Sequence, residues 1–198
     1  MNKGVHKYRN LISTLDAALV IIDDREGVAS SSGAAKDSEL VRVVELMKAA
    51  SAFAVPVIVT TIDTEEFAGQ VSELLLDLVR GSEVIQRSAA NPWDDDAFRN
   101  KIHTVDRSRL VIAGRCTEVS VTFAVLSALE EGFDVYIVKD ATAGTSQQHH
   151  ETAIERMVQA GAVPVTTRQI IFEWQRDLGS EPGSQGSPPG KKSRQKKP

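Results

Sequence analysis

The stretch LVIAGRCTEVSVTF, residues Leu110–Phe123, decides the fold of this chain of 198 residues. It runs from an apolar segment through a glycine-containing turn into residues that begin a helix. Thr117 is placed to cap that helix, which leaves the backbone N–H groups of the first helical turn without intrahelical acceptors. A turn of this kind, at the carboxyl end of a strand, predicts a site for an oxyanion or a carboxylate. Ser120, one turn into the helix, is predicted to face that site.

Apolar runs alternate with segments of helical spacing along most of the chain. We expect strands over Ala17–Ile22, Pro56–Ile62, Val84–Ile85, Leu110–Ala113, Phe133–Val138 and Ala162–Thr166. We expect helices over Ser38–Phe53, Glu65–Arg80, Glu118–Glu131, His150–Ala160 and Arg168–Leu178, with a loop and a helix within Ala89–Ile102. Strands that alternate with helices in this way form right-handed βαβ units, and the sequence therefore predicts an α/β fold with a parallel sheet.

The composition indicates one globular domain over residues 1–178. The formal net charge is −4 and there is one cysteine, so the chain offers neither a basic surface for nucleic acid nor a disulfide framework. No apolar run approaches the length of a membrane span, and the first residues lack the apolar core of a signal peptide. We therefore expect a cytoplasmic protein with no nucleic-acid or membrane partner. Residues 179–198, rich in Gly, Ser, Pro and Lys, are expected to form a disordered basic tail.

Residues at the ends of the predicted strands form a recognisable set of motifs. They are Asp23 after the first strand, Arg87 before NPWD at residues 91–94, the turn AGRCTEVSVTF at residues 113–123, and LSALEEGFDVYIVKDATAGT at residues 126–145. Together they resemble the isochorismatase-like hydrolase superfamily, and look most similar to a bacterial branch of small hydrolases of unknown substrate. The resemblance, from about residue 15 to about residue 178, implies a three-layer α/β/α, Rossmann-like fold with a six-stranded parallel sheet.

The resemblance also implies a catalytic set of an Asp, a Lys or Arg, and a Cys that attacks an amide-type carbonyl. By position, Asp23 matches the acid/base and Arg87 matches the basic residue that orients it. The peptide bond between Cys116 and Thr117 matches an unusual cis bond of the family, around which backbone amides bind the oxyanion. Ser120 occupies the position of the nucleophilic cysteine.

Ser120 is the main departure from the family pattern. A serine hydroxyl is less acidic than a thiol and normally needs a His or Lys base, whereas a carboxylate is a weak base even for a thiol. No histidine is well placed to serve as that base, since His149 and His150 open a helix beyond the fifth strand. Cys116, four residues upstream, substitutes for the nucleophile only if its side chain faces the pocket rather than the interior.

Two functional hypotheses follow. The first is a hydrolase of a small-molecule amide (C–N) or ether-type bond, either with Ser120 as nucleophile or without a covalent intermediate, with Asp23 as general acid or base. Isochorismatases proper lack the cysteine and give a precedent for the second route. The alternative is a catalytically inactive member that serves as a ligand-binding or oligomerisation scaffold. A deliberate Cys→Ser substitution is a third explanation of the serine.

The remaining candidate residues surround this position. Arg25 stands where many relatives carry Gln, and it either pairs with Asp23 or faces solvent. Asn91 and Trp93 are expected in the pocket, with Trp93 as its aromatic wall or as a core anchor. In metal-binding members the Asp after the second strand is followed by histidines, whereas Asp63 is not, so we expect no metal ion. No phosphate-binding or dinucleotide-binding motif is present, and we expect no cofactor.

The expected partners are a small-molecule substrate and, because the family is usually oligomeric, further copies of the chain. Arg168–Leu178 carries the apolar residues Ile170, Ile171, Phe172 and Trp174. This helix is either an oligomer interface or a cover for the sheet edge and the core.

Overall fold

The computed structural model describes residues 10–23, 36–64, 75, 78 and 84–176. Its strands are β1 (Ala17–Ile22), β2 (Val57–Ile62), β3 (Val84–Arg87), β4 (Arg109–Arg115), β5 (Asp134–Ala143) and β6 (Val163–Val165). Its helices are α1 (Lys36–Ala52), α3 (Asp96–Thr104), α4 (Thr122–Glu130), α5 (Gln147–Gln159) and α6 (Thr167–Gln175). A 3₁₀ turn (Pro92–Asp94) precedes α3, and a π-helical segment (Thr117–Val121) precedes α4.

The six strands form one parallel sheet in the order β3-β2-β1-β4-β5-β6. The chain moves outward from β1 through β2 to β3, and then crosses to the other side of β1 to build β4, β5 and β6. The direction in which successive strands are added therefore changes between β1 and β4. Open α/β sheets bind ligands at this position. The predicted α/β/α fold with a six-stranded parallel sheet is confirmed.

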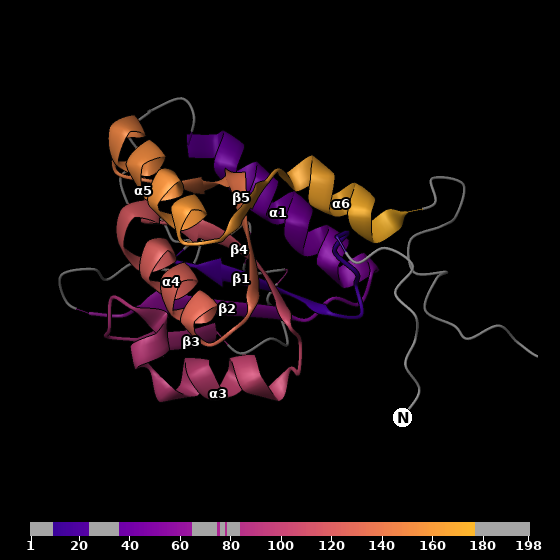
Figure 1. The fold of residues 1–198 in the computed structure, drawn as a ribbon, viewed down its shortest axis with the longest axis horizontal. Helices are drawn as coiled ribbons and strands as arrows, with labels where there is room; N and C mark the ends of the chain where they lie inside the picture. The colour runs from indigo at the N-terminus through magenta and orange to yellow at the C-terminus, as the bar shows by residue number, and fades with distance from the viewer. Residues whose placement is uncertain (1–9, 24–35, 65–74, 76–77, 79–83, 177–198) are drawn as a thin grey trace, which may run out of the picture.

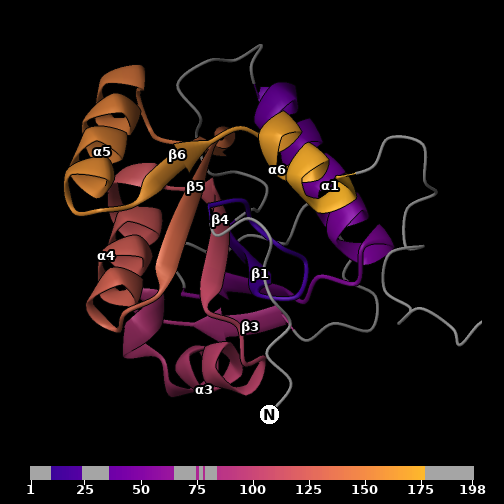
Figure 2. The ribbon, with the colours of Figure 1, turned by 45° about the vertical axis from the view of Figure 1, so that its right-hand side comes forward.

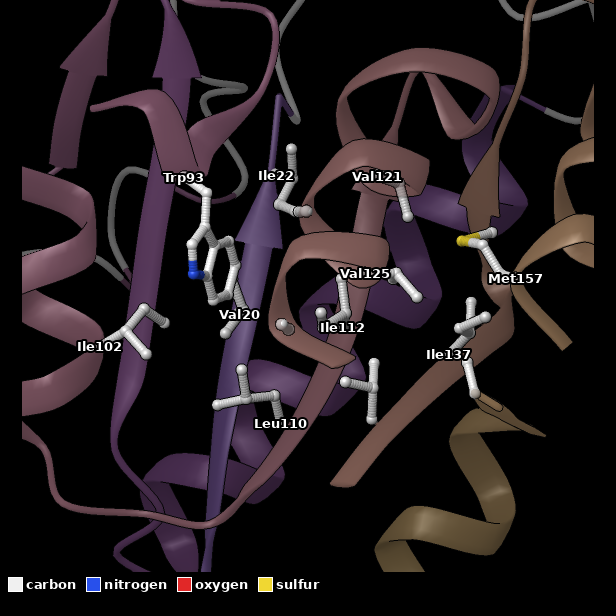
Figure 3. Packing of buried hydrophobic residues seen from close by; sticks show 14 of the residues in the cluster. Val20, Ile22, Trp93, Ile102, Leu110, Ile112, Val121, Val125, Ile137 and Met157 are labelled. Carbon is white, nitrogen blue, oxygen red and sulfur yellow. The ribbon is translucent and has the colours of Figure 1, made fainter. Parts of the chain in front are cut away.

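Helices cover both faces of this sheet. α1 and α6 lie side by side on one face, and α3, α4 and α5 lie on the other (Figures 1 and 2). Every residue of β1 is buried because each face of the strand meets a core: Leu19 belongs to the core under α1, and Val20 to the core under α4. Figure 3 shows this second core, where Val20 and Ile112 of adjacent strands face Val125 of α4.

The close approach of β4 to β1 depends on Gly114. Its φ is +137°, and an added Cβ would lie 2.0 Å from the carbonyl oxygen of Ile22. A residue with a side chain would have to push the two strands apart at this point. The glycine thus keeps the end of β4 directly beside the end of β1, where Asp23 follows.

The start of the helix after β4 differs from the prediction. We expected a helix over Glu118–Glu131 capped by Thr117, but the π-helical segment comes first and its cap position is Cys116. Cys116 has a left-handed backbone, with φ of 56°, and its side chain makes no capping hydrogen bond. The cap prediction was wrong because Thr117 is drawn into a tertiary contact, described below.

Three expectations fall outside the described residues. They concern Arg25, the basic tail over residues 179–198, and the helix over Glu65–Arg80, of which only Leu75 and Leu78 are described. They stay predictions, as does the extent of the domain. In the ranges given above, no helix combines the length and the apolar character that a membrane crossing requires.

Candidate active site

Asp23 follows β1 directly, and its carboxylate is fully buried. Oδ1 accepts a hydrogen bond from the backbone N–H of Ile62 at 2.8 Å, and Oδ2 accepts one from Nη2 of Arg87 at 2.7 Å. The backbone of Asp23 lies in the left-handed region, with φ of 52°. Non-glycine residues in this region are uncommon and cluster at functional sites. The carboxylate is therefore held in one orientation at the end of the central strand.

Arg87 is the last residue of β3, and its side chain reaches past β2 to Asp23. The guanidinium is fully buried, and Nη1 donates to the carbonyl oxygens of Ala89 and Ala90. These contacts fix the plane of the guanidinium as well as its distance from the carboxylate. The structure thus places Asp23 and Arg87 in direct contact.

Ser120 lies in the π-helical segment after β4. The N–H groups of Val119 and Val121 both donate to the carbonyl of Cys116, at 3.0 and 3.4 Å. Single π-helical turns within helices occur frequently at functional sites. Ser120 is 1% exposed, and within the described part of the chain its Oγ has no hydrogen-bond partner. Because buried hydroxyls are nearly always paired, this one is available to a bound molecule.

The peptide bond between Cys116 and Thr117 is trans, as is every peptide bond between described residues. The cis bond that the resemblance implied is therefore not found, and this expectation is corrected. The left-handed backbone of Cys116 makes the change of direction from strand to helix, and its side chain is half-buried. Binding of an oxyanion by the amides of this turn stays a prediction.

Thr117 is fully buried and contacts α5. Its hydroxyl is hydrogen-bonded to Nδ1 of His150 at 3.0 Å. His150 therefore lies beside the segment that carries Ser120 but bonds to Thr117, and the expectation that no histidine serves as the base for Ser120 stays a prediction. β4 and β5 are neighbours in the sheet, so the helices that follow them begin side by side. Adjacency of consecutive strands is the signal from which this position can be found.

Glu118 ties the same segment to the loop before α5. Its Oε1 accepts hydrogen bonds from the backbone N–H of Thr145, at 3.0 Å, and from the hydroxyl of that residue. Burial acts to raise the pKa of Glu118, but the hydrogen bonds from Thr145 and from the backbone N–H of Glu118, together with His149, lower it more, so the pKa lies below its ordinary value. Glu118 therefore has a structural contact beyond its favourable place in the first turn of a helix.

Asn91 and Trp93 lie in the turn that follows β3. Asn91 Oδ1 accepts from the backbone N–H of Trp93 at 3.1 Å, and its Nδ2 donates to Oγ of Ser127 in α4 at 3.1 Å. Trp93 is 5% exposed and packs edge-on against Phe98 and Phe133, with ring centroids 5.2 and 6.4 Å away. Trp93 is thus part of the core (Figure 3), and its role as a pocket wall stays a prediction.

The chain matches the model of the isochorismatase domain over residues 17–169. Among curated proteins it is similar to the probable hydrolase YcaC of Escherichia coli strain K12. The two are 33% identical over 164 residues, which cover 82% of this chain and 79% of YcaC. The residues matched by the domain model include all six strands, Asp23, Arg87 and Ser120.

Solved structures of two YcaC proteins share the fold. YcaC from Pseudomonas aeruginosa, solved with hexane-2,5-diol and covalent acrylamide, has a TM-score of 0.79 and 31% identity over 86% of this chain and 85% of that chain. YcaC from Escherichia coli, described as an octameric hydrolase of unknown specificity, has a TM-score of 0.79 and 32% identity with the same coverage. The domain match over most of the chain, together with these relatives, shows that the chain belongs to the isochorismatase-like hydrolase family.

Proposed function

We propose that the chain is a cytoplasmic hydrolase that cleaves an amide (C–N) or ether-type bond of a small molecule between the ends of β1 and β4. One observation carries the proposal. Asp23, whose buried carboxylate is paired with Arg87, follows β1. Ser120, a buried hydroxyl for which the described residues supply no partner, follows the adjacent strand β4. Family membership supports hydrolysis, and the change in strand order between β1 and β4 supports this edge as the place where substrate binds.

In the proposed reaction Asp23 moves the proton. Its carboxylate accepts a proton from a water molecule as the water oxygen bonds to the carbonyl carbon of the substrate. The proton is then donated to the leaving nitrogen as the C–N bond breaks, which yields an acid and an amine and restores the carboxylate. Arg87 keeps that carboxylate in position through the 2.7 Å bond.

Ser120 is proposed to bind the substrate rather than to attack it. An ordinary carboxylate titrates at about 4 and a thiol at about 8.5, and a serine hydroxyl is less acidic than a thiol. Neither the Ser120 hydroxyl nor water is acidic enough to be deprotonated by a carboxylate beforehand, so the proton leaves only as the attacking oxygen bonds to the carbonyl carbon. Attack by water completes the hydrolysis without an acyl-enzyme, and this is the route we propose. Ser120 Oγ, which has no hydrogen-bond partner among the described residues, is free to donate to the substrate.

Hydrolysis of a panel of small amides, including nicotinamide and N-carbamoyl compounds, tests the proposal. We expect Asp23→Asn to lower kcat/KM by about 10²-fold or more. Ser120→Ala is expected to retain turnover with a raised KM, and Ser120→Cys to raise kcat because a thiol is more easily activated. Asp134→Asn, at a carboxylate with 66% of its side chain exposed, is the matched control. Full activity in the Asp23→Asn variant would show that the proposal is wrong.

The serine at position 120 also favours a second candidate function, a binding scaffold that has lost turnover. In that case neither the wild type nor the Ser120→Cys variant hydrolyses any member of the panel, while a small acid or amide still binds. Binding is measured by calorimetry in the wild type and in Ser120→Ala. Turnover by the wild type excludes this alternative.

We also propose that the chain forms a homo-oligomer, since the related YcaC of Escherichia coli is described as octameric. α6 has two different sides. Ile170 and Trp174 are buried in the core, whereas Phe172 and Leu11, each about 40% exposed, border a groove of about 400 Å³. The helix therefore covers the core with one side and offers the other to a second copy.

A further inference from the structure

His150 connects α5 to the π-helical segment that carries Ser120. It lies on the first turn of α5 and is 9% exposed, and its Nδ1 is 3.0 Å from Oγ1 of the fully buried Thr117. α4 and α5 run side by side (Figures 1 and 2), so this contact joins the beginnings of two neighbouring helices.

The π-helical segment has no side-chain cap of its own. Cys116 at the cap position makes no capping hydrogen bond, although such a bond typically contributes about 1 kcal/mol. The carbonyl and the hydroxyl of the next residue are both hydrogen-bonded. The carbonyl of Thr117 accepts from the hydroxyl of Thr122 at 2.6 Å, and its hydroxyl bonds to His150. The segment that carries Ser120, three residues further on, is therefore hydrogen-bonded to α5 through its first residue.

The loop before α5 adds a second connection. Thr145 donates to Glu118, as described above, and Gly144 lies between Glu118 and His150. An added Cβ at Gly144 would lie 2.8 Å from Oε2 of Glu118 and 3.1 Å from Cβ of His150. The loop and the π-helical segment thus pack with no space for another side chain.

His150 is neutral in this contact. Burial lowers the pKa of the imidazole, and the ammonium group of Lys139 lowers it further. The carboxylates of Glu118, Glu151 and Glu39 act in the opposite direction but do not overcome these effects. A neutral imidazole donates at one nitrogen and accepts at the other, and the Thr117 hydroxyl suits either tautomer.

We propose that His150 is a positioning residue of the active site, which acts on Ser120 through Thr117. It holds the first residue of the π-helical segment, and so sets where the Ser120 hydroxyl and the nearby backbone N–H groups lie at the end of β4. The proposal rests on the proposed function, in which Ser120 faces the substrate.

A thiol at position 120 reports this positioning without any substrate. In a variant that combines Cys116→Ser with Ser120→Cys, residue 120 is the only cysteine, and its alkylation by iodoacetamide across pH gives the pKa of the thiol. We expect His150→Phe to slow alkylation at neutral pH about tenfold and to raise the thiol pKa, because the thiol is displaced from its place at the helix N-terminus, where a thiolate is favoured. His150→Asn, which retains a hydrogen-bonding group, is expected to reduce the alkylation rate less than His150→Phe does. His103→Phe, at an exposed histidine on α3, is the control.

Thr117→Val removes the other partner and gives an independent test. If His150 acts through Thr117, the double variant matches the more affected single variant, since both changes break the same bond. Additive effects, or a folded His150→Phe variant alkylated as fast as its parent, would overturn the proposal. Asp23→Asn in the same background separates the two hypotheses. A thiol pKa that responds to Asp23→Asn but not to His150→Phe rejects the positioning role alone, whereas a thiol that responds to neither rejects the proposed site.

Discussion

A carboxylate and a guanidinium lose hydration when they are buried, and their attraction repays that loss only with good geometry and further hydrogen bonds. Asp23 and Arg87 meet both conditions through the N–H of Ile62 and the carbonyls of Ala89 and Ala90. Apolar residues of similar volume often stabilise a fold equally well. The pair is therefore better explained by the proton transfer assigned to Asp23 than by stability.

Arg87→Met is expected to destabilise the fold by about 3–5 kcal/mol, because Asp23 then stays buried without its cation. Adding Asp23→Asn is expected to recover most of that loss while activity stays absent. The free energy of unfolding in urea measures both effects. Arg99→Met, at a half-exposed arginine paired with Asp96, is the control and should cost less than about 1 kcal/mol. Equal costs at the two arginines would contradict the argument.

The burial of His150 makes the stability of the fold depend on pH. Its pKa lies below the ordinary value of 6.5 through burial and Lys139, so below that pH the unfolded chain binds a proton that the folded chain does not. The contribution of the neutral His150 to the free energy of unfolding is therefore fully present above pH 6.5 and is lost as the pH falls. We expect His150→Asn to make the melting temperature less dependent on pH between about pH 7 and about pH 5. The lowered pKa of Glu118 acts in the same direction, but only below its ordinary value of 4.5. An unchanged slope in His150→Asn would reject this account.

Among the elements, the strands can be predicted from the sequence, but the start of the helix after β4 cannot. β1 and the middle of β4 are buried on both faces, so continuous apolar runs mark them. The π-helical segment depends on a hydrogen bond between Thr117 and His150, which are 33 residues apart. Nothing local distinguishes Thr117 from an ordinary cap. Asp23 and Arg87 are 64 residues apart. Only the resemblance to a family predicted that they share a site.

Gly144→Ala tests the packing between the loop before α5 and the π-helical segment. The added methyl group would lie 2.8 Å from Glu118 Oε2, so we expect a loss of about 1–3 kcal/mol in unfolding free energy and lower activity. Glu118→Ala removes the obstructing atom. The double variant should therefore be more stable than the sum of the two single losses predicts. Strictly additive losses of unfolding free energy would show that the added methyl group does not clash with Glu118.

For the molecule as a whole, the change in strand order between β1 and β4 divides the candidate site between two halves of the chain. The half built on β3, β2 and β1 supplies the buried ion pair, and the half built on β4, β5 and β6 supplies Ser120 and its support from α5. Neither half alone carries a complete site. Substrate bound across the boundary would contact both, so binding is expected to stabilise the folded chain as one unit.

The exposed side of α6 is the surface through which we propose that copies of the chain associate. A stable interface covers about 800 Å² on each copy, with apolar residues at its centre. Phe172, which is 39% exposed and partly covered by Arg168, has the right character for such a centre. We expect the wild type to elute as an oligomer in size-exclusion chromatography with light scattering, and Phe172→Glu to lower its mass. Val158→Glu, at an equally exposed residue of α5, should leave the mass unchanged. A monomeric wild type rejects the oligomer, and a Phe172→Glu variant of unchanged mass rejects α6 as its interface. Because Ile170 and Trp174 on the buried side are untouched, a lower mass with an unchanged melting temperature assigns the effect to the interface and not to unfolding.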